Sequence, residues 1–249
     1  MKKKIVALCL IVVLAVTAIT GATLAYFTDT EEATNTFTSG KVDITLVENF
    51  GDNNPDTPEK LMPGKENAVK KEVTITLEAG SEESFVWYTY LIPAGLDSTD
   101  GSTGTNNVVH VNGYGYTWDT YRDNSQYWLE GQTAALPLEQ TWDHTAFSPE
   151  GLVGTETIDG IVYNVYAALY HGTLTAENDT TTPGMSQVYL DAGVDYQDGN
   201  YVDKDGNVIT VDLTDFDIIV RAYAMQANIA DADGDGDVDV YDAYKLYNE

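Results

Sequence analysis

The chain has 249 residues, of which 40 are Asp or Glu and 12 are Lys or Arg, so its formal net charge is −28. Binding to nucleic acid or to an anionic membrane surface requires positive charge and is therefore not expected. Hydrophobic residues make up 43% of the chain and 17 residues are tyrosine, which indicates a folded protein rather than a disordered acidic polymer.

The N-terminus has the pattern of a secretory signal peptide. Three lysines at positions 2–4 precede an uncharged, mostly apolar run from Ile5 to Ala25. Small residues at Thr23 and Ala25 predict cleavage after Ala25, which places residues 26–249 outside the cytoplasm. As a helix, the apolar run would be about 31 Å long, so an uncleaved membrane anchor is the alternative.

The single cysteine, Cys9, lies inside the predicted signal peptide. It is not expected to carry a lipid anchor, because most of the apolar run follows it. After cleavage the chain can form no disulfide, and it can use neither a cysteine nucleophile nor a thiolate metal site.

Residues 26–40 form a polar arm between the expected cleavage site and the first predicted strand. Phe27 and Phe37 are isolated apolar anchors in it. Once cleavage frees it, such an arm could lie along an open sheet edge of the same molecule or of a neighbour. The alternative is a frayed terminus without a role.

Beyond the arm, apolar residues recur with the strand period of two. Val42, Ile44 and Leu46 alternate with Asp43, Thr45 and Val47, and apolar residues alternate with polar ones over 73–78. The segment Ser84–Ile92 is aromatic and β-branched and is predicted to be a more buried strand. The segment Phe216–Ala227 is predicted to be a last long strand in the centre of a sheet.

Two Asp-Gly pairs between apolar segments predict β-hairpins. Asp159 and Gly160 lie within the predicted strand pair 156–170, and Asp205 and Gly206 separate Tyr201-Val202 from Val208-Ile209. Loops are expected at 50–63, 97–107 and 178–184, and Pro137 is expected to begin a single helical turn over 136–140. Residues 41–229 are thus predicted to form one all-β domain, a jelly-roll-like β-sandwich.

Residues 230–249 are predicted to form a calcium loop followed by a short helix. Oxygen ligands recur at the spacing of a twelve-residue calcium loop, with Gly236 at the sharp turn in position 6. The predicted metal-binding residues are Asp231, Asp233, Asp235, Asp237 through its carbonyl, Asp239 through water, and Asp242. Asp at position 12 is shorter than the usual Glu, so binding on the order of 0.1–1 mM is expected. The alternative is an acidic, solvated tail.

Apolar residues at helical spacing follow the loop, namely Val240, Ala243, Tyr244 and Tyr247, and they predict an apolar helix face. The segment Asp203–Val208 resembles a second calcium loop, but Tyr201 stands where the first ligand is required. A hairpin turn is therefore the preferred interpretation there. Dockerins need two such loops, so cellulosome attachment is not expected.

The stretch from Gly21 to Ile44 resembles the TasA/camelysin family of secreted bacterial proteins. Looser similarity occurs at 61–64, 180–191 and 220–226. In that family a SipW-type signal peptidase processes the signal. The resemblance implies a jelly-roll-like sandwich that acts as a fibre subunit of an extracellular or biofilm matrix. Family members can assemble by giving an N-terminal strand to the next subunit, which would assign a role to residues 26–40.

Camelysin-type members have also been classed as metallopeptidases. The three histidines, His110, His144 and His171, are not spaced as H-E-x-x-H, so the usual helix-borne zinc site is not expected. No other nucleophile or phosphate-loop motif stands out. A secreted metallopeptidase is kept as an alternative function.

The leading functional prediction is a secreted, calcium-binding fibre subunit of a cell surface or biofilm matrix that acts by assembly and without catalysis. Its expected partners are further copies of itself, the signal peptidase and calcium, with membrane contact only through the signal segment. Another alternative is a monomeric adhesin that binds sugar through its tryptophans, which would otherwise belong to the core: Trp87, Trp118, Trp128 and Trp142.

Overall fold

A computed structural model describes residues 41–50, 61–101, 104–113, 136–147 and 151–249. The chain divides into Met1–Ser39 and Gly40–Glu249, and every described residue belongs to the second unit. The predicted signal peptide, the arm, Trp118 and Trp128 therefore lie outside the described residues. Within the described residues, no helix is long and apolar enough to cross a membrane.

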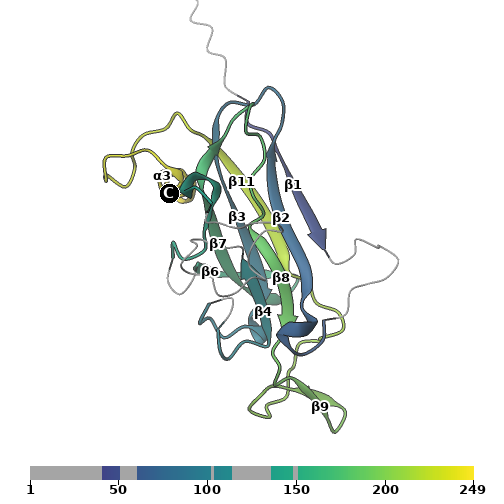
Figure 1. The fold of residues 1–249 in the computed structure, drawn as a ribbon. Coiled ribbons are helices and arrows are strands. Elements are labelled where there is room, and N and C mark those ends of the chain that lie inside the picture. Colours follow the sequence, from purple (N-terminus) through teal and green to yellow (C-terminus); the bar gives the residue numbers. More distant parts are fainter. Residues whose placement is uncertain (1–40, 51–60, 102–103, 114–135, 148–150) are drawn as a thin grey trace, which may run out of the picture. The chain divides into compact units, whose positions relative to one another are not determined.

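Two antiparallel sheets form the body of Gly40–Glu249 (Figure 1). The first has the order β1 (Ile44–Phe50), β2 (Val69–Leu77), β8 (Met185–Leu190), β4 (Val109–Gly113). The second has the order β11 (Ile219–Gln226), β3 (Ser84–Pro93), β7 (Ile161–Leu174), β5 (Trp142–Asp143), and β6 (Leu152–Ile158) also pairs with β7. The predicted all-β sandwich is confirmed.

Short elements complete the described part of the fold. They are the small hairpin of β9 (Asp195–Gln197) and β10 (Asn200–Val202), three 3₁₀ turns η1 (Lys65–Asn67), η2 (Ala94–Leu96) and η4 (Leu138–Gln140), and the helix α3 (Val240–Asn248). Pro137 immediately precedes η4, so the single turn predicted there is confirmed.

The main core lies between the two sheets because each strand turns its alternate apolar side chains inward. Val73, Ile75 and Leu77 of β2 are buried in this core, as are Val86, Tyr88 and Tyr90 of β3. Full burial of each such side chain stabilises the fold by about 1.5–3 kcal/mol. All ten residues of β3 are buried, which confirms the more buried strand predicted there.

The Asp-Gly pairs form the tight turns that their conformational freedom allows. Asp159 and Gly160 have φ of 50° and 86°, so the predicted β6–β7 hairpin is confirmed. Gly206 has φ of 82° within the second predicted turn, which a bridge between Val202 and Val208 closes.

The position predicted for the last strand is wrong, because among the described strands β11 pairs only with β3 and lies at the edge of its sheet. Its apolar residues occupy both faces, as in a central strand. Ala222 packs on the main core, whereas Tyr223 and Met225 pack on a second apolar cluster outside the sandwich. Two covered faces do not require two neighbouring strands.

The second apolar cluster forms where α3 covers the outer face of β3, β7 and β11. Phe85, Trp87, Ala167 and Leu169 of the sheet are buried there with Val240 and Ala243 of α3. Trp87 is 1% exposed; its ring stacks on Tyr223 with centroids 5.7 Å apart and meets Tyr244 edge-on at 5.9 Å. The predicted helix and its apolar face are thus confirmed.

Candidate metal centre

The acidic loop before α3 is held in shape by its own carboxylates. Asp231 accepts hydrogen bonds from the backbone N–H groups of Gly234 at 2.6 Å and Gly236 at 3.1 Å. Both glycines have positive φ, 83° and 104°, which other residues adopt only with strain. The glycines therefore let the loop wrap around the carboxylate of Asp231.

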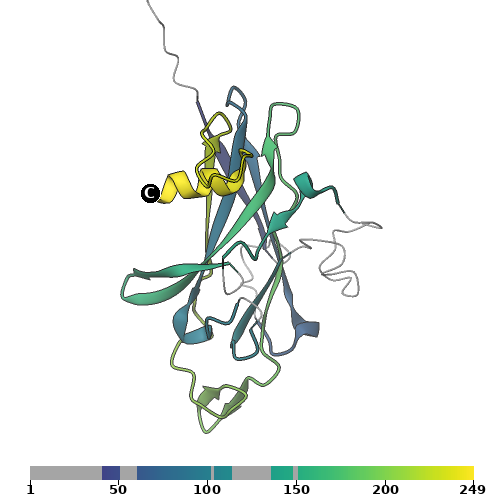
Figure 2. The same cartoon turned by 90° about the vertical axis from the view of Figure 1, so that its left-hand side faces the viewer.

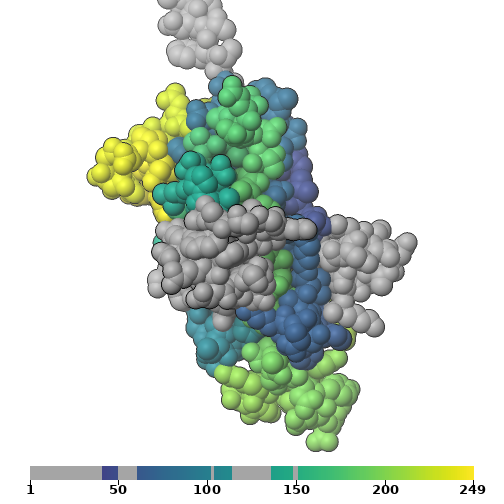
Figure 3. Space-filling view, viewed as in Figure 1, coloured from purple at the N-terminus to yellow at the C-terminus, as the bar shows by residue number. Residues whose placement is uncertain are grey.

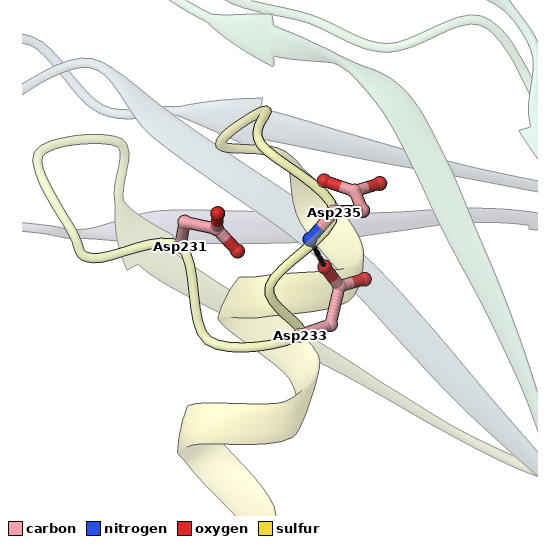
Figure 4. Close-up of side chains that lie close together, drawn as sticks. All are labelled: Asp231, Asp233 and Asp235. Atoms are coloured by element: carbon pink, nitrogen blue, oxygen red, sulfur yellow. Dashed lines mark hydrogen bonds between the residues drawn. The ribbon is translucent and has the colours of Figure 1, made fainter.

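Three carboxylates meet inside this loop. Asp233 accepts from the N–H of Asp235 at 3.0 Å, and oxygen atoms of Asp231, Asp233 and Asp235 lie within 4.8 Å of one another (Figure 4). All three residues are exposed. Several carboxylate oxygens at this spacing suit a hard cation such as calcium.

The side chains of the other predicted ligands lie outside this group of three carboxylates. Asp239 is the N-cap of α3, and its side chain accepts from the N–H groups of Tyr241 and Asp242. The Asp237 side chain lies outside the group of three carboxylates, and its N–H donates to Asp235. The structure therefore brings together the carboxylates of three of the six predicted residues, and the backbone carbonyl predicted as the Asp237 ligand stays a prediction.

Asp242 is fully buried and accepts three backbone hydrogen bonds. One of its oxygens accepts from Ala232 at 2.6 Å and Asp233 at 2.9 Å, and the other accepts from Asp239 at 3.0 Å. Burial alone would raise the pKa of this carboxyl, but the three N–H donors and the charge of Lys245 outweigh burial and lower the pKa. Asp242 thus acts as a fixed anion that joins the start of the loop to α3.

Further contacts fasten α3 to the rest of the described fold. Tyr241 donates its hydroxyl hydrogen to Asp143 of β5 at 2.5 Å, and the Lys245 ammonium donates to the carbonyl of Ala232 at 2.7 Å. The loop and α3 lie on the surface of the sandwich (Figure 3). Because Asp242 and Lys245 both contact residues 232–233, the shape of the loop and the position of the helix depend on each other.

Sequence reasoning missed Asp143 of β5 altogether, and it named Asp242 as a calcium ligand but missed its anchoring role. Asp143 carries no motif of its own, and only the fold brings it to Tyr241. For Asp242, the capping pattern of Asp239 followed three residues later by an acid was a usable signal.

The three histidines lie in three separate environments. His110 bonds to Asp191 through Nε2 at 3.0 Å and stacks on Tyr189, and His171 contacts Thr141. Among the described residues, the cluster of potential metal-binding side chains contains no histidine. His144 lies near Gly113 and Tyr88 instead.

His144 should make folding sensitive to moderate acid. Burial lowers its pKa from 6.5 to about 4, although the charge of Asp143 opposes this, and its Nε2 is sealed from solvent without a partner. The unfolded chain therefore takes up this proton near pH 6.5 and the folded chain only near pH 4. The shift predicts that the unfolding free energy falls by about 3 kcal/mol as pH drops through this window.

Urea denaturation at several pH values between 7 and 4, on the wild type and on His144→Gln, measures this effect. The variant should lose stability less steeply than the wild type as pH falls. Equal slopes for the two proteins would show that His144 does not titrate in this way.

The segment at Asp203 is a hairpin turn, in agreement with the preferred interpretation. Its carboxylate accepts from the N–H groups of Asp205 at 2.9 Å and Asn207 at 2.8 Å. A cavity of about 110 Å³ adjoins it and is lined by Asn106, Asn107, Val108, Asp191, Val194, Asp203, Lys204 and Asp205. Its volume is well below that of a typical pocket for an organic ligand, so it suits water rather than a peptide.

The described residues define a class of protein, a β-sandwich that carries an acidic loop and a docked C-terminal helix. A family model described as camelysin metallo-endopeptidase matches residues 1–74. This confirms the resemblance to the TasA/camelysin family over a segment that extends through β1 into β2, whereas the acidic loop lies outside the match. No curated protein and no solved structure gives a match.

Proposed function

We propose that this chain is a secreted structural subunit of a cell-surface or biofilm matrix fibre, assembled through residues 26–40 and stabilised by calcium. The observation that carries the proposal is the position of β1, which follows the arm in the sequence and pairs only with β2 among the described strands. A strand with one unpaired edge can accept an added strand from another chain.

The pattern of burial on β1 supports this use of the edge. Ile44 and Leu46 are only partly buried, although both pack against the main core. A strand added beside β1 would cover these side chains further and would satisfy the free backbone groups of the edge. The match to the camelysin family covers this strand together with the arm.

Calcium has two roles in the proposal. An ion held by Asp231, Asp233 and Asp235 would offset the repulsion of three exposed carboxylates in a chain of net charge −28. It would also fix the loop that Asp242 connects to α3, and so keep the aromatic face around Trp87 covered. Ion binding and helix docking would then reinforce each other.

The tryptophans on which an adhesin would depend give that alternative little support where the structure describes them. Trp87 and Trp142 are each 1% exposed, and the indole N–H of Trp142 donates to the carbonyl of Thr182 at 2.8 Å. Neither ring is available to stack on a sugar.

A metallopeptidase remains the second candidate because the matching family model carries that description. Separate placement of His110, His144 and His171 supports the structural role instead. Casein hydrolysis by the exported protein distinguishes the two functions. Activity that a zinc chelator abolishes and that persists after contaminants are removed would establish the peptidase.

Electron microscopy of the exported protein with calcium tests the fibre proposal. Filaments are expected, and mass spectrometry of their N-terminus should find Tyr26 as the first residue. Strictly monomeric particles at high protein concentration would contradict assembly.

A further inference from the structure

The β6–β7 hairpin projects from its sheet (Figure 2). Strand β6 pairs with the first part of β7, and no described strand pairs with its other edge. The register is regular from Gly154 to Ile158, after an irregularity next to Leu152. A row of backbone N–H and C=O groups is therefore presented to solvent along β6.

This edge lacks the usual protection against pairing with another chain. Natural edge strands are blunted by proline, lysine, inward-pointing charges or β-bulges. The irregularity of β6 lies at its start, next to Leu152, and the regular part from Gly154 to Ile158 has one charged residue, Glu156. Arg221 of β11 neutralises that charge through two hydrogen bonds to the carboxylate, at 2.6 Å and 2.9 Å. The edge is thus close to electrically neutral.

Exposed apolar side chains lie on both strands of the same hairpin. Val153 is 37% exposed, and Ile161 and Val162 are each 47% exposed. Across residues 152–166 the acidic residues are Glu156 and Asp159, so Asp159 at the turn carries the one charge that Arg221 does not offset. In a chain of net charge −28, two copies repel each other over most surfaces, and this hairpin is a place where that repulsion is small.

We propose that β6 pairs antiparallel with β6 of a second copy of this chain, about a two-fold axis close to Thr155. A two-fold contact places the same edge on both partners, and two identical edges then run antiparallel and exchange backbone hydrogen bonds. Thr155 is the middle residue of the strand. The contact is small, so the dimer is weak and becomes populated at high local protein concentration.

This contact uses neither the arm nor the calcium loop, and it therefore stands independently of the proposed fibre mechanism. In a fibre it would join one filament to another sideways. Salt should strengthen it, because screening reduces the general repulsion between acidic copies while the backbone pairing is hardly affected.

Cysteine cross-linking tests the register directly. Exported protein with Cys9→Ser and Thr155→Cys carries one thiol, and opposite residues of an antiparallel pair lie about 4.5–5.5 Å apart at Cα, within disulfide range. Mild oxidation should give a disulfide-linked dimer quickly. The matched control is Val208→Cys in the same background, since Val208 is 56% exposed and lies outside the β6–β7 hairpin. Equal cross-linking of the two variants would overturn the proposal.

Analytical ultracentrifugation gives a second, thiol-free test. Thr155→Lys places like charges opposite each other across the axis and should weaken dimerisation at least about tenfold. Val208→Lys adds the same charge elsewhere and should not weaken it. Unchanged association of Thr155→Lys would contradict the contact. Loss of the cross-link on deletion of residues 28–40 would show that the arm, and not β6, makes the dimer.

Discussion

Asp242→Ala is expected to release α3 from the outer face of the sheet. The substitution leaves the part-buried N–H groups of Ala232, Asp233 and Asp239 without their acceptor. An unsatisfied donor costs about 1–3 kcal/mol where water is excluded and less where water reaches it. The helix has nine residues and is too short to persist alone in water. Its docking should therefore fail as a unit, whereas the main core between the sheets stays folded.

Tryptophan fluorescence measures this release, because Trp87 packs against Tyr244 and Tyr247 of α3. The emission should shift to longer wavelength in Asp242→Ala, and the shift should disappear when Trp87→Phe is added. Asp237→Ala is the matched control, since it removes the same charge from the same loop without removing a described acceptor. An unshifted spectrum for Asp242→Ala would show that Asp242 does not hold the helix.

Calcium binding is expected to be lost in the double variant Asp231→Ala/Asp235→Ala. Two of the three carboxylates that meet in the loop would be gone, together with the acceptor that holds Gly234 and Gly236. The dissociation constant for calcium should rise at least about tenfold, because affinity in such loops follows the number of charged ligands.

Isothermal titration calorimetry with calcium measures this loss. Asp237→Ala should bind nearly as the wild type does, because calcium loops use the backbone carbonyl at this position. Binding heats that are equal for the wild type and the double variant would remove the calcium site from the account.

The sandwich was predictable from sequence because its signals are local. Alternation over 73–78 and the aromatic run of β3 follow from which face of a strand is buried, and an Asp-Gly pair limits the turn to one geometry. The Asp198-Gly199 turn of the β9–β10 hairpin carries the same signal and was overlooked. The place of β11 was not predictable, since pairing order depends on contacts far apart in the chain.

The candidate metal site also has a part that local sequence signals predict and a part that depends on contacts between distant residues. Asp231, Asp233 and Asp235 meet because each folds the backbone just after it, so their spacing alone predicts the cluster. The position of Asp242 depends on N–H donors nine and ten residues earlier, which both bind one of its oxygens. The match of the residue spacing to an ideal calcium loop could not reveal that backbone donors compete with an ion for the carboxylate of Asp242.

The aromatic face under α3 was also beyond sequence reasoning. Trp87 and Tyr223 come from strands 136 residues apart in numbering, and they stack only because β3 and β11 are neighbours in register. A tryptophan in an aromatic, β-branched segment predicts burial but not the element that covers it.

Deletion of residues 28–40 tests the central claim most directly, because it removes the arm and keeps the expected cleavage site after Ala25. The exported wild type and the deletion variant are compared by electron microscopy at equal concentration with calcium, after circular dichroism has shown the same β content. Assembly through the arm predicts filaments for the wild type and separate particles for the variant. Filaments of the same form in both samples would contradict it.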